Sequence, residues 1–149
     1  MKLELRDVLD SDLPILFEHQ WDPEANRMAA FPARERDAFL AHWRGKVLVN
    51  PSNGRKTVLV DGHVAGYVVS WNADDLRLAG YWIGRAFWGR GVASAALAAY
   101  LQHEQTRPLC AWVAVHNTGS IRVLEKCGFQ RMSTREHEGV VEHFYRLEE

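Results

Sequence analysis

Hydrophobic and polar positions alternate along some segments of the chain, and hydrophobic positions recur at helical spacing along others. Alternating and β-branched runs predict strands, because the side chains of a strand point to opposite faces in turn. Asp61-Gly62 separates two such runs and is typical of a two-residue hairpin turn. Strands are expected at residues 3–6, 57–60, 64–71, 76–83, 109–115, 131–134 and 140–147.

Helical spacing predicts a short helix after Asp12 and further helices over residues 34–46, 92–101 and 117–127. Residues 21–33 carry two prolines and mixed polarity, and we expect a loop with weak helical content there. The resulting order is β-α-α-β-β-β-α-β-α-β-β, a mixed α/β fold. The chain contains no repeat, low-complexity tract or linker, so residues 1–149 are expected to form a single domain.

The most informative segment is the glycine-rich turn between the strand at 76–83 and the following helix. It runs Trp88-Gly89-Arg90-Gly91-Val92-Ala93-Ser94. The start of a helix leaves backbone N–H groups without partners, and glycines let a ligand approach them closely. The turn therefore predicts a seat for a phosphate or pyrophosphate. It is neither a P-loop, because Arg90-Gly91 stands where Lys-Ser/Thr is needed, nor a Gly-x-Gly-x-x-Gly dinucleotide motif.

A second segment, residues 116–129, predicts a well-capped amphipathic helix. Asn117 is a good N-cap, Ile121 and Leu124 mark an apolar face, and Gly128 suits the left-handed residue that closes a helix. Phe129 is expected to fold back onto Leu124.

Together the two segments resemble the GNAT superfamily of acyl-CoA-dependent N-acetyltransferases, and especially the branch of ribosomal-protein-alanine acetyltransferases. The resemblance covers residues 76–129. The family's Arg/Gln-x-x-Gly-x-Gly/Ala motif falls on residues 88–93, with Trp88 in its first place. The family's Asn-x-x-Ser…Gly-Phe pattern is met by Asn117, Ser120, Gly128 and Phe129. The resemblance implies a GNAT-like fold, with splayed central strands that admit the pantetheine arm.

It also implies a site for acetyl-CoA as co-substrate. The backbone of Trp82 and Ile83 would contact the pantetheine, and the amides of residues 89–94 would hold the pyrophosphate. Two interpretations of Trp88 are equally good: it contacts the cofactor, or it is only a loop aromatic that packs over the start of the helix. Asn117 would contact the pantetheine arm besides capping its helix. The implied cofactor-binding residues are Trp82, Ile83, Trp88, Gly89, Arg90, Gly91, Val92, Ala93, Ser94 and Asn117.

The catalytic groups are less well marked. Many family members protonate the leaving thiolate with a Tyr seven residues after the Asn, but that position is Leu124 here. The resemblance to the ribosomal branch makes Ser120 the candidate acid, although Ser is also favoured in the first turn of a helix. A Glu often found two residues before the strand glycine is replaced by Leu78. Asp74 and Asp75 lie at the preceding turn, where we expect solvated side chains, and His116, Glu136 or Glu138 could act as a base directly or through water.

The acceptor stays open between a protein N-terminus, a free amino acid, a polyamine and an aminoglycoside. The resemblance to the ribosomal branch favours a protein or peptide α-amine. Residues 18–44 mix charged and aromatic side chains, which suggests a polar pocket with aromatic walls but selects no substrate.

Composition narrows the classes of function. Apolar residues make up 47% of 149, charged residues 25%, and the net charge is −1, which is unlike a nucleic-acid-binding domain. We expect no membrane span, because no apolar run approaches the roughly 20 residues that one needs. We also expect no disulfide framework and no metal site, because Cys110 and Cys127 are too few and too scattered. Two unpaired thiols and no signal sequence favour the cytoplasm. A sheet edge or the last hairpin leaves a homodimer possible.

Two functions of different classes follow. The first is acetyl transfer from acetyl-CoA to a primary amine by direct attack in a ternary complex. The alternative is a catalytically silent CoA-binding sensor or interaction module, because Leu78 and Leu124 stand where catalytic groups often lie. A protein that binds another phosphate compound is a third possibility, but it leaves the segment from Asn117 to Phe129 unexplained.

Overall fold

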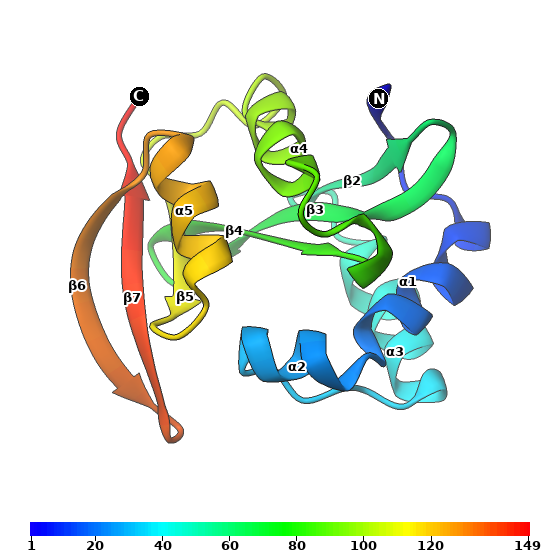
Figure 1. Ribbon diagram of the computed structural model, residues 1–149, viewed down its shortest axis with the longest axis horizontal. Coiled ribbons are helices and arrows are strands. Elements are labelled where there is room, and N and C mark those ends of the chain that lie inside the picture. The colour runs from blue at the N-terminus through cyan, green and yellow to red at the C-terminus, as the bar shows by residue number, and fades with distance from the viewer.

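The computed structural model describes residues 1–149. It contains one seven-stranded mixed sheet with helices on both faces (Figure 1). In the sheet the strand order is β1-β2-β3-β4-β5-β7-β6. The strands are β1 (Leu3–Arg6), β2 (Gly54–Val60), β3 (His63–Ala73), β4 (Leu76–Ile83), β5 (Leu109–Ala114), β6 (Gln130–His137) and β7 (Val140–Leu147). The helices are α1 (Leu13–Gln20), α2 (Pro23–Ala29), α3 (Arg36–His42), α4 (Val92–Tyr100) and α5 (Thr118–Lys126). Short helical turns are η1 (Asp10–Asp12), η2 (Trp43–Val47) and η3 (Arg85–Phe87).

The predicted mixed α/β fold is confirmed, and so is the β2–β3 hairpin turn. Asp61 and Gly62 have φ angles of 50° and 82°, the two positive values that a type I′ turn requires. β2, β3 and β6 extend beyond the predicted limits, because each continues its pairing with a neighbouring strand past the hydrophobic run.

Two expectations about helices need correction. The predicted loop at 21–33 contains the helix α2, whose first N–H groups are served by the side chain of Asp22, which accepts a hydrogen bond from the Glu24 N–H at 3.1 Å. Pro23 occupies the first helical position, where its missing N–H costs nothing. The predicted helix at 34–46 is the shorter α3, which continues into the π-helical turn η2.

Each face of the sheet has its own group of helices. Apolar side chains of α4 and α5, among them Val92, Leu97 and Leu124, pack on one face in the main core. Leu16 of α1 and Phe39 of α3 belong to a second core cluster, which packs against Tyr67 and Val69 of β3 on the other face. Because successive side chains of a strand alternate, Gly80 and Trp82 face the α1–α3 layer while Tyr81 faces α5.

β4 and β5 run parallel, but they pair only at Leu78 and Cys110. Beyond that point the two strands separate, and Figure 1 shows the gap between them with α2 below it. The edge of β4 from residue 79 to residue 83 is therefore not covered by β5. This confirms the splayed central strands expected from the resemblance.

A buried polar network stabilises the closed end of the gap. The side chains of Arg77 and Glu104 form an ion pair at 2.8 Å and are only 12% and 8% exposed. Ser70 of β3 donates to the Glu104 carboxylate at 2.6 Å and also bonds the Tyr100 hydroxyl of α4. The network thus ties β3, β4 and the end of α4 together beside Leu78, where β4 and β5 meet.

Candidate active site

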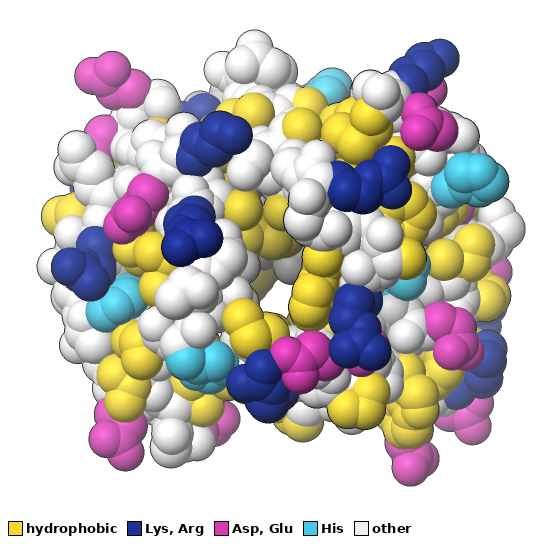
Figure 2. All heavy atoms as spheres, viewed as in Figure 1, with side chains coloured by type: hydrophobic (Ala, Val, Ile, Leu, Met, Phe, Trp, Pro, Cys, Tyr) yellow, Lys and Arg dark blue, Asp and Glu magenta, His cyan; other side chains and the backbone are white.

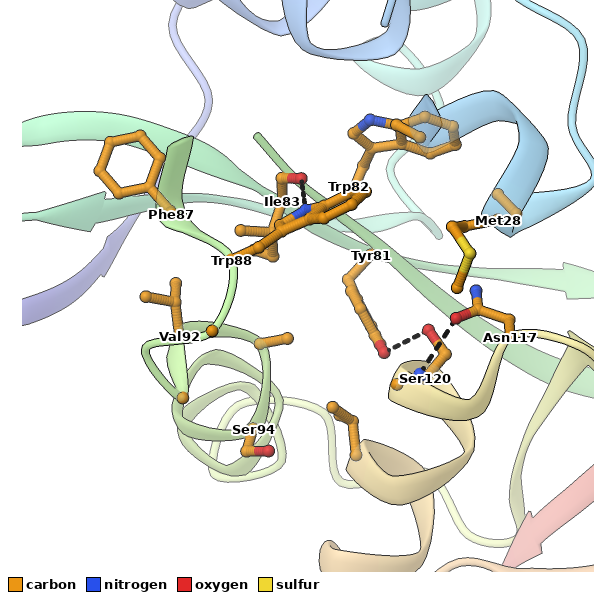
Figure 3. Close-up of a pocket in the computed structure, with 17 residues that line it drawn as sticks. Met28, Tyr81, Trp82, Ile83, Phe87, Trp88, Val92, Ser94, Asn117 and Ser120 are labelled. Atoms are coloured by element: carbon orange, nitrogen blue, oxygen red, sulfur yellow. Dashed lines mark hydrogen bonds between the residues drawn. The ribbon is translucent and has the colours of Figure 1, made fainter. Parts of the chain in front are cut away.

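A cavity of about 320 Å³ lies at the open end of the gap between β4 and β5. Figure 2 shows a hollow in the middle of this face with hydrophobic side chains around it. Its walls come from α2, the end of β4, the η3–α4 turn and the start of α5 (Figure 3). The lining residues are Ala25, Met28, Ala29, Tyr81, Trp82, Ile83, Phe87, Trp88, Gly89, Gly91, Val92, Ala93, Ser94, Asn117, Gly119, Ser120 and Val123.

The structure brings together every predicted site residue except Arg90. The Arg90 guanidinium lies outside the lining, 5.7 Å from the centre of the Phe87 ring. All other predicted cofactor-binding residues, and Ser120, line this one cavity. Segments separated by more than twenty residues in the sequence therefore meet at one site.

The glycine turn presents a row of free backbone donors. The N–H groups of residues 89 to 94 donate no hydrogen bond to another backbone group, and no side chain caps α4. Gly89 and Gly91 both have a φ of 74°, and a Cβ at either position would meet nothing within 4 Å. Unpaired amides, a helix N-terminus and open space together fit an anionic group such as a phosphate.

The free edge of β4 offers main-chain groups to an extended ligand. The carbonyl of Trp82 points toward β3, because a Cβ on Gly66 would collide with it. The carbonyl of Ile83 faces the open edge instead, where it accepts a hydrogen bond from the Trp88 indole at 2.8 Å. Of the two predicted backbone contacts, Ile83 is therefore the one on the cavity side, whereas Trp82 contributes its side chain.

Asn117 and Ser120 lie at the start of α5. The Asn117 Oδ1 accepts a hydrogen bond from the Ser120 N–H at 3.2 Å, so Asn117 caps the helix as expected. Its Nδ2 donates to no protein group and lies on the cavity side (Figure 3). One side chain can therefore cap the helix with its oxygen and bind a ligand with its nitrogen.

Sequence reasoning missed Tyr81, which points from β4 toward α5 (Figure 3). Its hydroxyl lies 2.6 Å from the Ser120 Oγ. Burial raises the pKa of Tyr81 to about 12, so the phenol keeps its proton at neutral pH. Ser120 is the one polar side chain that bonds the Tyr81 hydroxyl, and a buried donor needs an acceptor. Either hydroxyl can donate in this bond, and when Tyr81 donates, the Ser120 hydrogen is left free to point into the cavity.

The end of α5 follows the prediction. Gly128 has a φ of 94°, and the Phe129 N–H donates to the Leu124 carbonyl at 3.0 Å. Leu124 and Phe129 are buried together in the main core. Leu124 supplies no acid at the cavity, because its side chain is apolar and belongs to this packing.

The candidate bases are scattered. Asp74 has a φ of 53° in the turn between β3 and β4. His116 is exposed, and its Nε2 bonds the Arg27 carbonyl at the end of α2 at 2.8 Å. Glu138 lies in the β6–β7 turn with its side chain 85% exposed. None of these residues, nor Asp75 or Glu136, lines the first cavity, but Glu138 lines a neighbouring cavity that also includes Ser120.

Two further cavities reach Gly80, Tyr81 and Trp82, and only the second of them lies on the α1–α3 side of the sheet. One, of about 720 Å³, runs between β5, the β6–β7 hairpin and residues 29–32, and it shares Asn117 and Ser120 with the first cavity. The other, of about 790 Å³, lies between α3, η2 and β3. The end of β4 can thus be reached from both faces of the sheet, as transfer between two ligands requires.

A family model for the acetyltransferase (GNAT) domain matches residues 2–130. The chain belongs to the GNAT acetyltransferase family. The expected resemblance is therefore confirmed over most of the sequence, including the first helices, which carry no recognisable motif. The sequence matches none of the curated proteins with which it was compared.

Solved structures agree on the GNAT fold. The ribosomal-protein α-N-acetyltransferase RimL in complex with coenzyme A has a TM-score of 0.82 at 19% identity, covering 98% of this chain and 93% of RimL. A GNAT-family acetyltransferase from Bacillus anthracis has a TM-score of 0.82 at 17% identity, covering 99% and 95%. The aminoglycoside acetyltransferase AAC(6′)-Ib in complex with coenzyme A has a TM-score of 0.80 at 18% identity, covering 99% and 95%.

None of the helices of this protein combines the length and the apolar character needed to span a membrane. No three His, Cys, Asp or Glu side chains are grouped so that they could hold a metal ion.

Proposed function

We propose that this GNAT protein transfers an acetyl group from acetyl-CoA directly to a primary amine. The observation that supports the proposal is the continuity of one cavity from the free amides of residues 89–94 to the splayed edge of β4 and the Ser120 hydroxyl. The amides would hold the pyrophosphate, and the edge near Ile83 would bind the pantetheine arm. The CoA complexes of RimL and AAC(6′)-Ib, which share the fold, support the same choice of co-substrate.

The reaction needs a donor for the departing thiolate, and we propose Ser120. As the amine nitrogen forms its bond to the acetyl carbon, the carbon–sulfur bond breaks and negative charge develops on sulfur. A hydroxyl hydrogen aimed into the cavity can stabilise that charge and pass its proton to the sulfur. The attacking nitrogen loses a proton as its bond forms, and this proton returns through water to the Ser120 oxygen, so that the hydroxyl is restored and the step balances. Tyr81 acts as a positioning residue, because its donated hydrogen bond fixes the direction of the Ser120 hydroxyl.

The attacking amine must be neutral. The first cavity is lined mostly by hydrophobic side chains and by no carboxylate, and Glu138 and Glu142 line only the neighbouring cavity that shares Ser120. Such surroundings disfavour an ammonium ion and lower the pKa of an amine that enters them. The amine can therefore lose its proton to water on entry, without a base from β4, where Leu78 replaces the frequent Glu.

Calorimetric titration with acetyl-CoA, with ATP as the control, tests the co-substrate. We expect selective binding of acetyl-CoA, and equal or absent binding of both compounds would contradict the proposal. Release of CoA thiol in the presence of primary amines then tests turnover. Acetyl-CoA binding without turnover on any amine would favour the alternative function, a silent CoA-binding module.

Two variants test the roles of the hydroxyl pair. Ser120→Ala is expected to lower kcat by about 100-fold or more, the range for loss of a general acid, with an unchanged Kd for acetyl-CoA. Tyr81→Phe keeps the ring and the Ser120 hydroxyl but removes the orienting bond, so we expect a smaller loss of kcat. An unchanged kcat in Ser120→Ala would exclude Ser120 as the donor.

A further inference from the structure

The cavity of about 790 Å³ on the α1–α3 side of β4 has an uneven distribution of charge. It reaches the end of β4 at Gly80, Tyr81 and Trp82, and the last two of these residues also line the first cavity. Its lining includes Arg34, His42 and Lys46 but no Asp or Glu. An acceptor that enters here meets only positively charged or neutral side chains.

Arg34 is the best-defined of these cations. Its main chain is fixed by the buried Gln20 side chain, which accepts the Arg34 N–H at 2.9 Å and donates to the Arg34 carbonyl at 3.0 Å. The guanidinium carbon lies 5.4 Å from the centre of the Phe31 ring. Phe31 in turn packs edge-on against Trp82, with the ring centres 6.2 Å apart. The cation is thus held near the end of β4 by fixed elements.

Arg34 also has no carboxylate partner, unlike three other arginines of the protein. Arg36 pairs with Glu18 at 3.5 Å, Arg44 with Asp10 at 2.8 Å and Arg135 with Glu142 at 2.8 Å. Arg34 is half-buried and forms no ion pair. A half-buried guanidinium loses part of its hydration, and a carboxylate compensates this loss best through paired hydrogen bonds.

The neighbouring side chains strengthen the positive field. Lys46 forms no ion pair, and burial together with Arg34 and Lys46 lowers the pKa of His42. The imidazole is thereby kept neutral, where it can still hydrogen-bond a polar ligand. Aromatic side chains of Phe31, Trp71 and Trp82 supply apolar wall.

From this arrangement we infer that the acceptor is a small primary amine that carries a carboxylate and an apolar body, as an α-amino acid does. The inference rests on the proposed acetyl transfer: the amine would lie at the end of β4 and the carboxylate at Arg34. A volume of about 790 Å³ suits a small molecule. Polyamines and aminoglycosides would instead bring several positive charges to a cavity that has cations and no acid, which is unfavourable.

Matched pairs of amines test the inference. Each pair consists of an amino acid and its carboxamide, beginning with phenylalanine and phenylalaninamide, and the panel adds spermidine, kanamycin and an acidic tripeptide. Turnover is measured as CoA thiol released from acetyl-CoA. The carboxamide has the more readily deprotonated amine, so intrinsic reactivity favours it. We expect the opposite, a kcat/KM at least about tenfold higher for the carboxylate, as the loss of a charged hydrogen bond implies.

Arg34→Met keeps an unbranched apolar stem and removes the charge. It should bring the ratio of the two kcat/KM values close to one while leaving the Kd for acetyl-CoA unchanged. Arg36→Met is the matched control, since Arg36 is exposed and paired with Glu18, and it should keep the wild-type ratio.

The outcomes separate this inference from the proposed function. A preference for the carboxamide, spermidine, kanamycin or the peptide would overturn the inference while retaining acetyl transfer. A carboxylate preference that survives Arg34→Met would also overturn it. No turnover on the whole panel, despite binding of acetyl-CoA, would overturn the inference and count against acetyl transfer itself.

Discussion

Gly91→Val is the sharpest test of the anion seat in the η3–α4 turn. Gly91 has a φ of 74°, and a Cβ there meets nothing within 4 Å. The side chain therefore fits, and its cost to folding is the strain of a β-branched residue in a left-handed conformation, roughly 1–3 kcal/mol. The new methyl groups would stand beside the free amides of residues 89 to 94 and keep a phosphate from them.

The expected effect on binding follows from the hydrogen bonds lost. A hydrogen bond to a charged group contributes about 1.5–3 kcal/mol, and about 1.4 kcal/mol corresponds to a tenfold change in Kd. Loss of one such bond weakens binding by roughly 10- to 100-fold, and loss of two by more. We therefore expect the Kd for acetyl-CoA, measured by calorimetry, to rise by about 100-fold.

Gly139→Val is the matched control for backbone strain. Gly139 has a φ of 81° and equally open surroundings, but it lies in the β6–β7 turn and does not line the first cavity. Both variants should lose similar stability in urea, whereas only Gly91→Val should lose affinity for acetyl-CoA. Wild-type affinity in a folded Gly91→Val protein would refute the assignment of the seat.

The remaining predictions concern stability. Arg77→Leu leaves the Glu104 carboxylate buried without its partner, so the free energy of unfolding in urea should fall by about 3–5 kcal/mol. Arg135→Leu is the control at the more exposed pair with Glu142, and it should lower the free energy of unfolding by about 1 kcal/mol or less. Burial acts to raise the pKa of Asp12, but bonds from Arg6, the Leu9 N–H and Thr57 outweigh it, and the pKa lies below its usual value near 3.8. The stabilisation is thus present above pH 3.8 and lost as the pH falls through the lower folded-state pKa, so the urea midpoint should drop more steeply on acidification in the wild type than in Asp12→Asn.

The strands, the glycine turn at residues 88–94 and the start of α5 could be predicted because their signals are local. The β2–β3 turn requires a positive φ at two positions, and Asp61 and Gly62 supply them. The cap of α5 at Asn117 and the end of α5 at Gly128 need only neighbouring residues to form. The helix α2 also had a local signal, since Asp22, Pro23 and Glu24 supply a cap, a first helical residue and an acidic first turn. The two prolines and mixed polarity of residues 21–33 outweighed that signal in the prediction, although Pro23 starts the helix rather than breaking it.

The Tyr81–Ser120 pair and the Arg34 cavity depend on tertiary arrangement, which no spacing along the chain encodes. Tyr81 and Ser120 are 39 residues apart, and they meet because β4 separates from β5 only beyond Leu78. If the two strands paired along their whole length, β5 would cover the edge of β4 that borders the cavity. The Arg77–Glu104 network holds the closed end of this gap, so it supports the geometry of the site without touching a ligand. Loosening it with Arg77→Leu should therefore weaken acetyl-CoA binding as well as stability, through the spacing of β4 and α5.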